Sequence, residues 1–265
     1  MNEFNFHRPD SVAAALAQRR KAADGRFLAG GQSLLGAMKL GLAAPEELID
    51  LARVRELAGI TVDGSSIRIG AVTTHASVAA SPEVRSRLPG LARLADGIGD
   101  PSVRSRGTIG GSLANNDPAA CYPAGVLGLG ATIETDRRKI AADDFFRGLY
   151  ETALEPDELL VAVRFPVAQN TGWVKMPQPA SRFSLVGVFV SRGTQGVRVA
   201  VTGARACAFR VPALEQALAK DFSVKACEGV RIEPAGMNRD IHASPEYRAH
   251  LVGVLAQRAV AQALG

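Results

Sequence analysis

The sequence is poor in metal-binding residues, and this excludes several classes of redox site. It has three cysteines and four histidines in 265 residues. Cys121, Cys207 and Cys227 lie far apart with no C-x-x-C pair, so the chain alone cannot hold an iron–sulfur cluster or a four-cysteine zinc site. No H-E-x-x-H motif is present either. We therefore predict no metal site, and we interpret each histidine as a core or surface residue.

Aromatic residues and long apolar runs are also scarce. Phe, Trp and Tyr make up 5% of the chain, and the 31 basic residues are scattered among 26 acidic ones. Single-stranded nucleic acids are bound by basic grooves with interleaved aromatics, so we expect no nucleic-acid partner. No apolar run approaches the roughly 18 residues that a membrane span needs, and the first residues carry no apolar signal segment. We expect a cytoplasmic protein that is not integral to a membrane.

What is present is the composition of an ordinary globular chain. Hydrophobic residues make up 47% and charged residues 22%, and the length predicts about two domains. Strand and helix patterns are mixed without strict alternation, which favours an α+β fold over a doubly wound parallel sheet. Pro166, Gly172, Pro177 and Pro179 cluster between two predicted strands. This cluster predicts a boundary between domains 1–166 and 172–265.

Two glycine pairs have informative neighbours. Gly30–Gly31 follows a predicted strand at 26–29, precedes a helical pattern and brings Ser33 with it. Gly110–Gly111 lies in the segment 97–117, which has five glycines and which we expect to be a long functional loop. With 27 glycines in the chain, Gly-Gly pairs arise by chance, so the neighbours matter more than the pairs.

Such loops are suited to anions, because a backbone without Cβ atoms can approach a ligand and direct its N–H groups at it. The hydroxyls of Ser33, Thr108 and Ser112 would add donors. Two loops of this kind could hold a pyrophosphate from both sides, although tight turns would give the same pattern. Neither loop matches G-x-G-x-x-G or a P-loop, and G-x-S-x-G is absent. A bound cofactor is therefore expected to supply the chemistry, and we predict no catalytic residue.

Longer motifs carry a family resemblance. They are Ala29-Gly30-Gly31-Gln32-Ser33-Leu34, Ile69-Gly70-Ala71-Val72-Thr73-Thr74, Arg104-Ser105-Arg106-Gly107-Thr108-Ile109-Gly110-Gly111-Ser112-Leu113-Ala114 and Leu154-Glu155-Pro156-Asp157-Glu158-Leu159. In this order they resemble the FAD-binding medium subunit of molybdenum hydroxylases, of the carbon monoxide dehydrogenase and xanthine dehydrogenase type. Further matches extend the resemblance over nearly the whole chain.

The resemblance implies a fold in more detail. An FAD-binding domain of the vanillyl-alcohol oxidase-like type would comprise two α+β subdomains, about 1–55 and 56–166. A smaller C-terminal domain, 172–265, would have a three-stranded antiparallel sheet and helices.

The resemblance also implies a set of FAD-binding residues. By motif, the two loops would embrace the pyrophosphate through their backbone amides, Ile109 would lie near the flavin, Leu160 and Lys175 would approach the isoalloxazine ring, and Asp117 would orient its loop. The implied set is Ala29, Gly30, Gly31, Gln32, Ser33, Thr108, Ile109, Gly110, Gly111, Ser112, Asp117, Leu160 and Lys175. Many relatives carry an acid where this chain has Cys121, so this residue either loses a cofactor contact or is a small buried residue.

The function implied by the resemblance is electron transfer. A large molybdopterin subunit would oxidise the substrate, a small iron–sulfur subunit would relay electrons, and the FAD of this chain would deliver them to an acceptor whose identity the sequence leaves open. The complex would be a heterohexamer in the cytoplasm, reaching the inner face of the membrane only through its assembly. Two alternatives stay open, a stand-alone FAD-dependent oxidase or reductase and a flavin-free assembly subunit.

Overall fold

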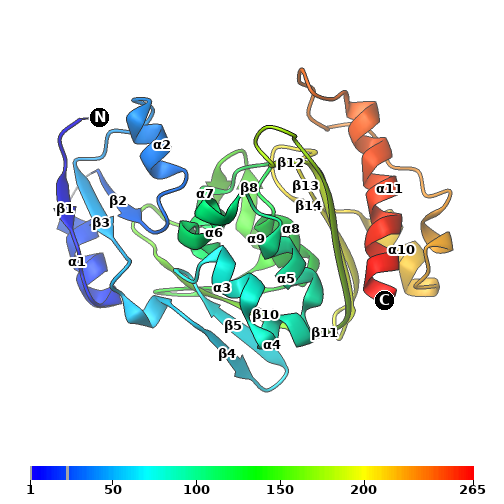
Figure 1. Cartoon of the computed structure of the whole chain (residues 1–265), viewed down its shortest axis with the longest axis horizontal. Helices are drawn as coiled ribbons and strands as arrows, with labels where there is room; N and C mark the ends of the chain where they lie inside the picture. The colour runs from blue at the N-terminus through cyan, green and yellow to red at the C-terminus, as the bar shows by residue number, and fades with distance from the viewer. Residues whose placement is uncertain (1, 22–23) are drawn as a thin grey trace.

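The computed structural model describes residues 2–21 and 24–265, and the N-terminal, middle and C-terminal parts of the chain lie from left to right in Figure 1. The N-terminal part is a parallel sheet in the order β1-β3-β2, with α1 packed against β2 and β3. Its elements are β1 (Asn5–His7), α1 (Val12–Lys21), β2 (Gly25–Leu28), α2 (Leu34–Lys39) and β3 (Glu47–Asp50). The buried side chains of Ala15, Leu16 and Ile49 form a small core there with Leu159, from much later in the chain.

The middle part is an antiparallel five-stranded sheet in the order β4-β5-β10-β6-β7. Its strands are β4 (Ile60–Asp63), β5 (Ser66–Gly70), β6 (Thr132–Thr135), β7 (Lys139–Ala141) and β10 (Leu160–Pro166). The helices are α3 (His75–Ala80), α4 (Pro82–Arg87), α5 (Pro89–Asp96), α6 (Pro101–Arg106), α7 (Ile109–Asn115), α8 (Tyr122–Gly128) and α9 (Ala142–Phe145). A small hairpin of β8 (Phe146–Gly148) and β9 (Glu151–Thr152) completes this part. Pro82 and Pro89 each begin a new helix and so divide the helical stretch from α3 to α5.

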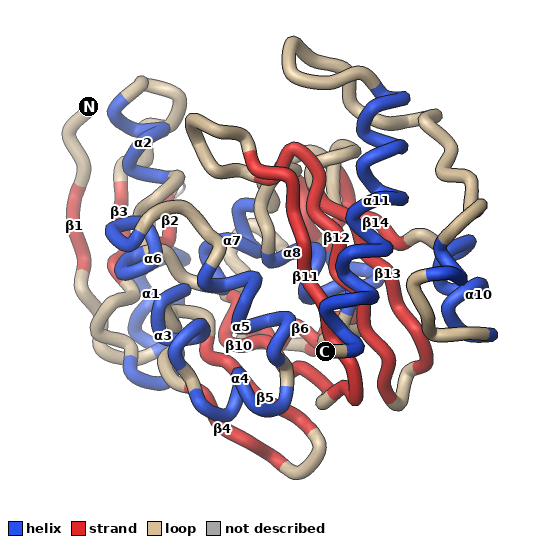
Figure 2. Tube along the Cα trace, turned by 45° about the vertical axis from the view of Figure 1, so that its right-hand side comes forward, coloured by secondary structure: helices blue, strands red, loops and turns tan. Residues whose placement is uncertain are grey.

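The C-terminal part is an antiparallel sheet in the order β11-β12-β13-β14 (Figure 2). Its elements are β11 (Ala168–Pro177), β12 (Ser184–Gly193), β13 (Gly196–Thr202), β14 (Phe209–Arg210), α10 (Pro212–Lys220) and α11 (Pro245–Leu264). The two-residue β14 adds a fourth strand to the three that were expected. Ser244 caps α11 by accepting a hydrogen bond from the Tyr247 N–H, and Pro245 occupies the first turn.

The C-terminal sheet is covered on both faces (Figure 1). Helices α5 and α8 pack on one face and α10 and α11 on the other. Trp173, Phe189 and Ala200 belong to the same buried cluster as the helices of the middle part. The predicted domains therefore share a continuous apolar core.

The structure differs from two expectations about segments. Residues 97–117, expected to be an irregular loop, contain α6 and α7, because Asp100 and Thr108 cap these short helices and Ile109 and Leu113 are buried. Residues 168–177, expected within the connection between domains, form β11. The change of sheet falls at Val167, between β10 and β11. The domain bounds themselves stay a prediction. Among the described residues, no helix combines the length and apolarity that crossing a bilayer requires.

Candidate functional site

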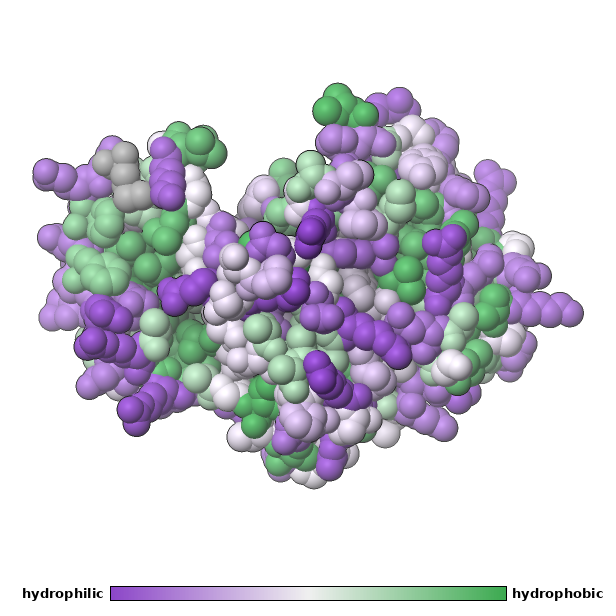
Figure 3. All heavy atoms as spheres, in the orientation of Figure 1, coloured by the Kyte–Doolittle hydropathy of each residue, from purple (hydrophilic) through white to green (hydrophobic). Residues whose placement is uncertain are grey.

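A cavity of about 400 Å³ lies where the three parts of the chain meet. In Figure 3 the surface is hollowed at the top of the view, between the region of α2 and the central region. The walls come from the loop between β2 and α2, the turn between α6 and α7, the first residues of β10, and the connection between β11 and β12. The lining includes Ala29, Gly30, Gly31, Gln32, Ser33, Thr108, Gly110, Gly111, Ser112, Asp117, Leu160 and Lys175, together with His75, Cys121, Ser181, Arg182 and Phe183.

The first glycine loop combines close packing with free donors. A Cβ on Gly30 would lie 2.3 Å from the Arg106 carbonyl oxygen, and Gly31 has a φ of +74° that favours glycine. Within the described chain, the backbone N–H groups of Gly30–Ser33 have no intramolecular acceptor, and the Ser33 side chain makes no capping bond. Four consecutive donors at a cavity wall suit an anion such as a pyrophosphate.

The second glycine turn leaves room in the cavity but offers few free hydrogen-bond donors to a ligand. The Ile109 N–H donates to the Thr73 carbonyl at 3.1 Å, and the Gly110 N–H to the Ala71 carbonyl at 2.8 Å. The Gly111 N–H donates to Thr108 Oγ1 at 3.2 Å. These amides, expected to face a ligand, are thus engaged within the chain. The missing Cβ of Gly111 faces Ala29 Cβ at 3.6 Å, so the absence of a side chain keeps the space between the loops open.

The wall opposite the first glycine loop carries Lys175, a half-buried residue of β11. Its ammonium group donates to the Gly97 and Arg182 carbonyl oxygens, both at 2.8 Å, and lies 3.5 Å from Cys121 Sγ. Cys121 is 5% exposed and also lies 3.5 Å from Ser184 Oγ. Cys121 is therefore both a small buried residue and part of the cavity wall.

The connection between β11 and β12 brings in residues that the sequence did not single out. Arg182 has a left-handed φ of +61°, and its guanidinium donates to the Gly99 carbonyl at 3.3 Å. Phe183 is 48% exposed although it lines the cavity. The segment Gln178-Pro179-Ala180-Ser181-Arg182-Phe183 is one of the further matches to the family, but spacing alone could not place it at the cavity.

Asp117 and Leu160 are fixed in the cavity wall by contacts with neighbouring segments of the chain. Asp117 accepts hydrogen bonds from the Ala119 N–H at 2.8 Å and from the Tyr150 hydroxyl at 3.2 Å. Leu160, 4% exposed, begins β10 directly after the loop that contains Glu158. Asp117 therefore ties the β8–β9 turn to the cavity wall.

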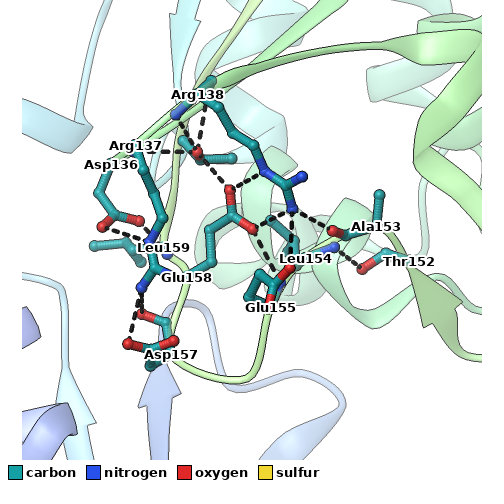
Figure 4. A network of polar contacts seen from close by, with 11 residues as sticks. Asp136, Arg137, Arg138, Thr152, Ala153, Leu154, Glu155, Asp157, Glu158 and Leu159 are labelled. Atoms are coloured by element: carbon teal, nitrogen blue, oxygen red, sulfur yellow. Dashed lines mark hydrogen bonds and ion pairs between the residues drawn. The ribbon is translucent and has the colours of Figure 1, made fainter.

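Glu158 anchors the loop before Leu160 (Figure 4). Its fully buried side chain accepts bonds from the Arg138 guanidinium at 2.9 and 2.7 Å. It also accepts bonds from Thr135 Oγ1 at 2.7 Å and the Glu155 N–H at 2.9 Å. Hydrogen bonding from Arg138 is the main reason that the pKa of Glu158 is lowered to about 2. This network fixes where β10 enters the cavity.

His75 is a cavity residue that the sequence analysis placed only in the core or at the surface. It is 5% exposed, and its ring centroid is 5.3 Å from that of Tyr122. Its ring also lies next to Gly107, where a Cβ would be 2.5 Å from His75 Nε2. Burial, and then the charge of Arg104, lower the pKa of His75 to about 4, so the imidazole is neutral near pH 7. Its Nδ1 is buried without a hydrogen-bond partner among the described residues.

The structure brings the predicted site residues together with one exception. Ile109 is fully buried in the core and is not part of the lining, whereas the other twelve line the cavity. The lining contains three cationic residues, Arg26, Lys175 and Arg182, and one carboxylate, Asp117. The cavity therefore combines an apolar floor, a row of free amides and an excess of positive charge, which suits a large anionic ligand.

Comparison with known proteins gives concordant matches. Residues 2–168 match the family described as the FAD binding domain in molybdopterin dehydrogenase. The carbon monoxide dehydrogenase medium chain of Hydrogenophaga pseudoflava is 36% identical, with 97% of this chain and 96% of that protein covered. The nicotine 6-hydroxylase medium subunit of Paenarthrobacter nicotinovorans is also 36% identical, with 98% and 97% covered. The structure of reconstituted CO dehydrogenase from Oligotropha carboxidovorans superposes with a TM-score of 0.90 at 32% identity, over 99% of this chain and 98% of that one.

Proposed function

We propose that this chain, which belongs to the family of FAD-binding domains in molybdopterin dehydrogenases, passes electrons from an iron–sulfur partner to an external acceptor. Membership makes it an oxidoreductase subunit with FAD as its cofactor, in line with the expected FAD-binding medium subunit of a molybdenum hydroxylase. FAD supplies the capacity to take up and release electrons. What the chain's own residues do is bind it, orient it and screen it from water.

The observation that supports this proposal most is the row of free amides in the first glycine loop. The N–H groups of Gly30–Ser33 would hold the FAD pyrophosphate, with the hydroxyls of Ser33 and Ser112 beside it. Gly30 and Gly111 would keep the two loops close yet the space between them open. Leu160 would pack against the apolar part of the cofactor. These assignments extend the predicted site, with Ile109 supporting it from the core rather than from the lining.

Two observations support the proposal that this chain has partner subunits: its few metal-binding side chains and the names of its relatives. Its three cysteines are free and separate, and the described residues hold no group of three His, Cys, Asp or Glu side chains that could bind a metal. The chain spans nearly the full length of relatives named as medium chains. We therefore assign the iron–sulfur relay and the molybdopterin to a small and a large partner subunit. Those relatives are named for carbon monoxide and for nicotine, so we assign no substrate.

Purification through a tag on this chain tests the proposal. Isolated from its native host, the chain should bring down two partners, and the complex should contain FAD, iron and molybdenum. The chain expressed alone should contain FAD only. If instead the chain alone is reduced by small organic substrates and no partner copurifies, it is a stand-alone flavoprotein and the proposal fails.

A further inference from the structure

Lys175 is a cation of the cavity wall without a counter-ion. Its three N–H groups face two carbonyl oxygens and the sulfur of Cys121. Among the described residues, no Asp or Glu oxygen lies within 4.0 Å of its Nζ. Among these residues, no carboxylate in direct contact offsets the charge of this half-buried ammonium, and solvent screens that charge less than it would at the surface.

The groups around Lys175 add to this charge rather than offset it. Arg182 donates to the Gly99 carbonyl, and Arg104 donates to the Ile98 and Gly99 carbonyls at 3.0 and 3.1 Å. Asp96 lies 3.9 Å from Arg104, but its side chain is 74% exposed. Three cations thus converge on three successive carbonyl groups at the end of α5.

We propose that Lys175 acts on the cavity's ligand by charge alone and, given the proposed function, raises the reduction potential of bound FAD. All of its donors are occupied, so it has none left to bond to the ligand. An uncompensated positive charge in the wall favours any ligand state that carries more negative charge, and electron uptake by FAD creates such a state. Lys175 is then a residue that sets the driving force for electron entry, and Cys121 matters because its thiol leaves that charge unbalanced.

Cys121→Asp tests the proposal by placing a carboxylate next to the ammonium in a side chain of similar size. We expect the ratio of reduced to oxidised FAD at a fixed potential to fall about tenfold, which is ~30 mV for a two-electron couple. The measurement is a spectroelectrochemical titration of the full-length chain with FAD bound. Cys121→Ser is the matched control and should leave the potential unchanged. A higher potential in Cys121→Ser would contradict the proposal, because it would show that the sulfur already balances the lysine.

A second pair of variants changes the cation itself. Lys175→Met should lower the potential by a similar amount, whereas Lys175→Arg, which keeps the charge, should leave it near that of the unsubstituted protein. If Lys175→Met loses FAD or does not fold, Cys121→Asp and Lys175→Arg decide the matter. Unchanged potential in Cys121→Asp overturns the proposal. Failure of the unsubstituted chain to bind FAD would instead overturn the proposed function, so the two failures are distinguishable.

Discussion

Gly30 is the residue on which the approach of the two loops depends most directly. A methyl group there would lie 2.3 Å from the Arg106 carbonyl oxygen and 2.7 Å from Gly107 Cα, both backbone atoms that cannot rotate away. We predict that Gly30→Ala pushes the loops apart and weakens FAD binding by about 5- to 150-fold, because overpacking of this kind costs about 1–3 kcal/mol. Fluorescence titration of the apoprotein with FAD measures the affinity.

Gly36→Ala is the matched control for this substitution. Gly36 lies six residues further along, inside α2, and a Cβ there meets no heavy atom within 4 Å. Alanine also favours a helix over glycine, so this variant should fold as well as the unsubstituted chain or better. If Gly30→Ala binds FAD as tightly as Gly36→Ala does, the loop contact has no role in binding.

Glu158 carries a pH dependence whose sign is fixed by its lowered pKa. The group has a pKa of about 2 in the folded chain, below its usual 4.5, so its contribution to stability is fully present above pH 4.5 and is lost as the pH falls toward 2. We predict that Glu158→Gln lowers the free energy of unfolding by about 2 kcal/mol at pH 7, allowing for solvent around the half-exposed Arg138. Urea unfolding at pH 7 and at pH 3 measures this. A difference between variant and unsubstituted chain that stays as large at pH 3 would contradict it.

Individual residues were predictable from the sequence where local chemistry is distinctive. The pairs Gly30–Gly31 and Gly110–Gly111 stood out because their neighbours bring hydroxyls and follow or precede regular elements. His75 and Arg182 did not, since nothing in their own neighbourhoods shows that the chain folds them against those loops. The sequence also did not show which backbone N–H groups are free. The N–H groups of Gly110 and Ile109 donate to the carbonyls of Ala71 and Thr73, which lie more than thirty positions earlier.

At the scale of elements, strand β11 depends on helices packed tightly on both of its sides. A Cβ on Gly172 would lie 1.9 Å from the Ala259 carbonyl oxygen of α11, and the Gly90 N–H of α5 donates to Thr171 Oγ1 at 2.9 Å. We predict that Gly172→Ala destabilises the chain by about 2–3 kcal/mol, because α11 must move off the sheet. Gly253→Ala, on the open side of the same helix, should be neutral or stabilising. Chemical unfolding of both variants distinguishes them, and equal stabilities would show that α11 does not pack as described.

Elements with strong apolar periodicity or clear caps were predictable, and the glycine-rich ones were not. Prolines mark the starts of α4, α5 and α11 in the sequence, and α4 and α11 also have a serine cap. Helix α7 escaped prediction because glycine has low helix propensity, and its stability comes from tertiary contacts of Ile109 and Leu113. Helix α6 contains no glycine and no buried residue, and the glycines on both sides of it made its segment resemble a loop. Asp100 before Pro101, and Thr108 as a potential cap, were the signals that could have revealed them.

At the scale of the whole molecule, the cavity is built by segments far apart in the sequence. The glycine loops belong to the first 120 residues, whereas Lys175 and Phe183 come from the C-terminal sheet. The same sheet shares its core with the helices of the middle part through Trp173 and Phe189. Length and composition predicted two domains, but the joint cavity depends on long-range packing that a single sequence does not encode locally.

The flavin content of a folded Gly111→Trp variant tests most directly whether FAD occupies this cavity. The added Cβ would lie 2.9 Å from Thr108 Oγ1 and 3.6 Å from Ala29 Cβ, so the indole ring beyond it would project between the two loops. Gly253→Trp, where no heavy atom lies within 4 Å of the added Cβ, is the control. We predict that Gly111→Trp still unfolds cooperatively but contains almost no FAD, while the control retains it. Normal FAD content in Gly111→Trp would contradict the assigned site.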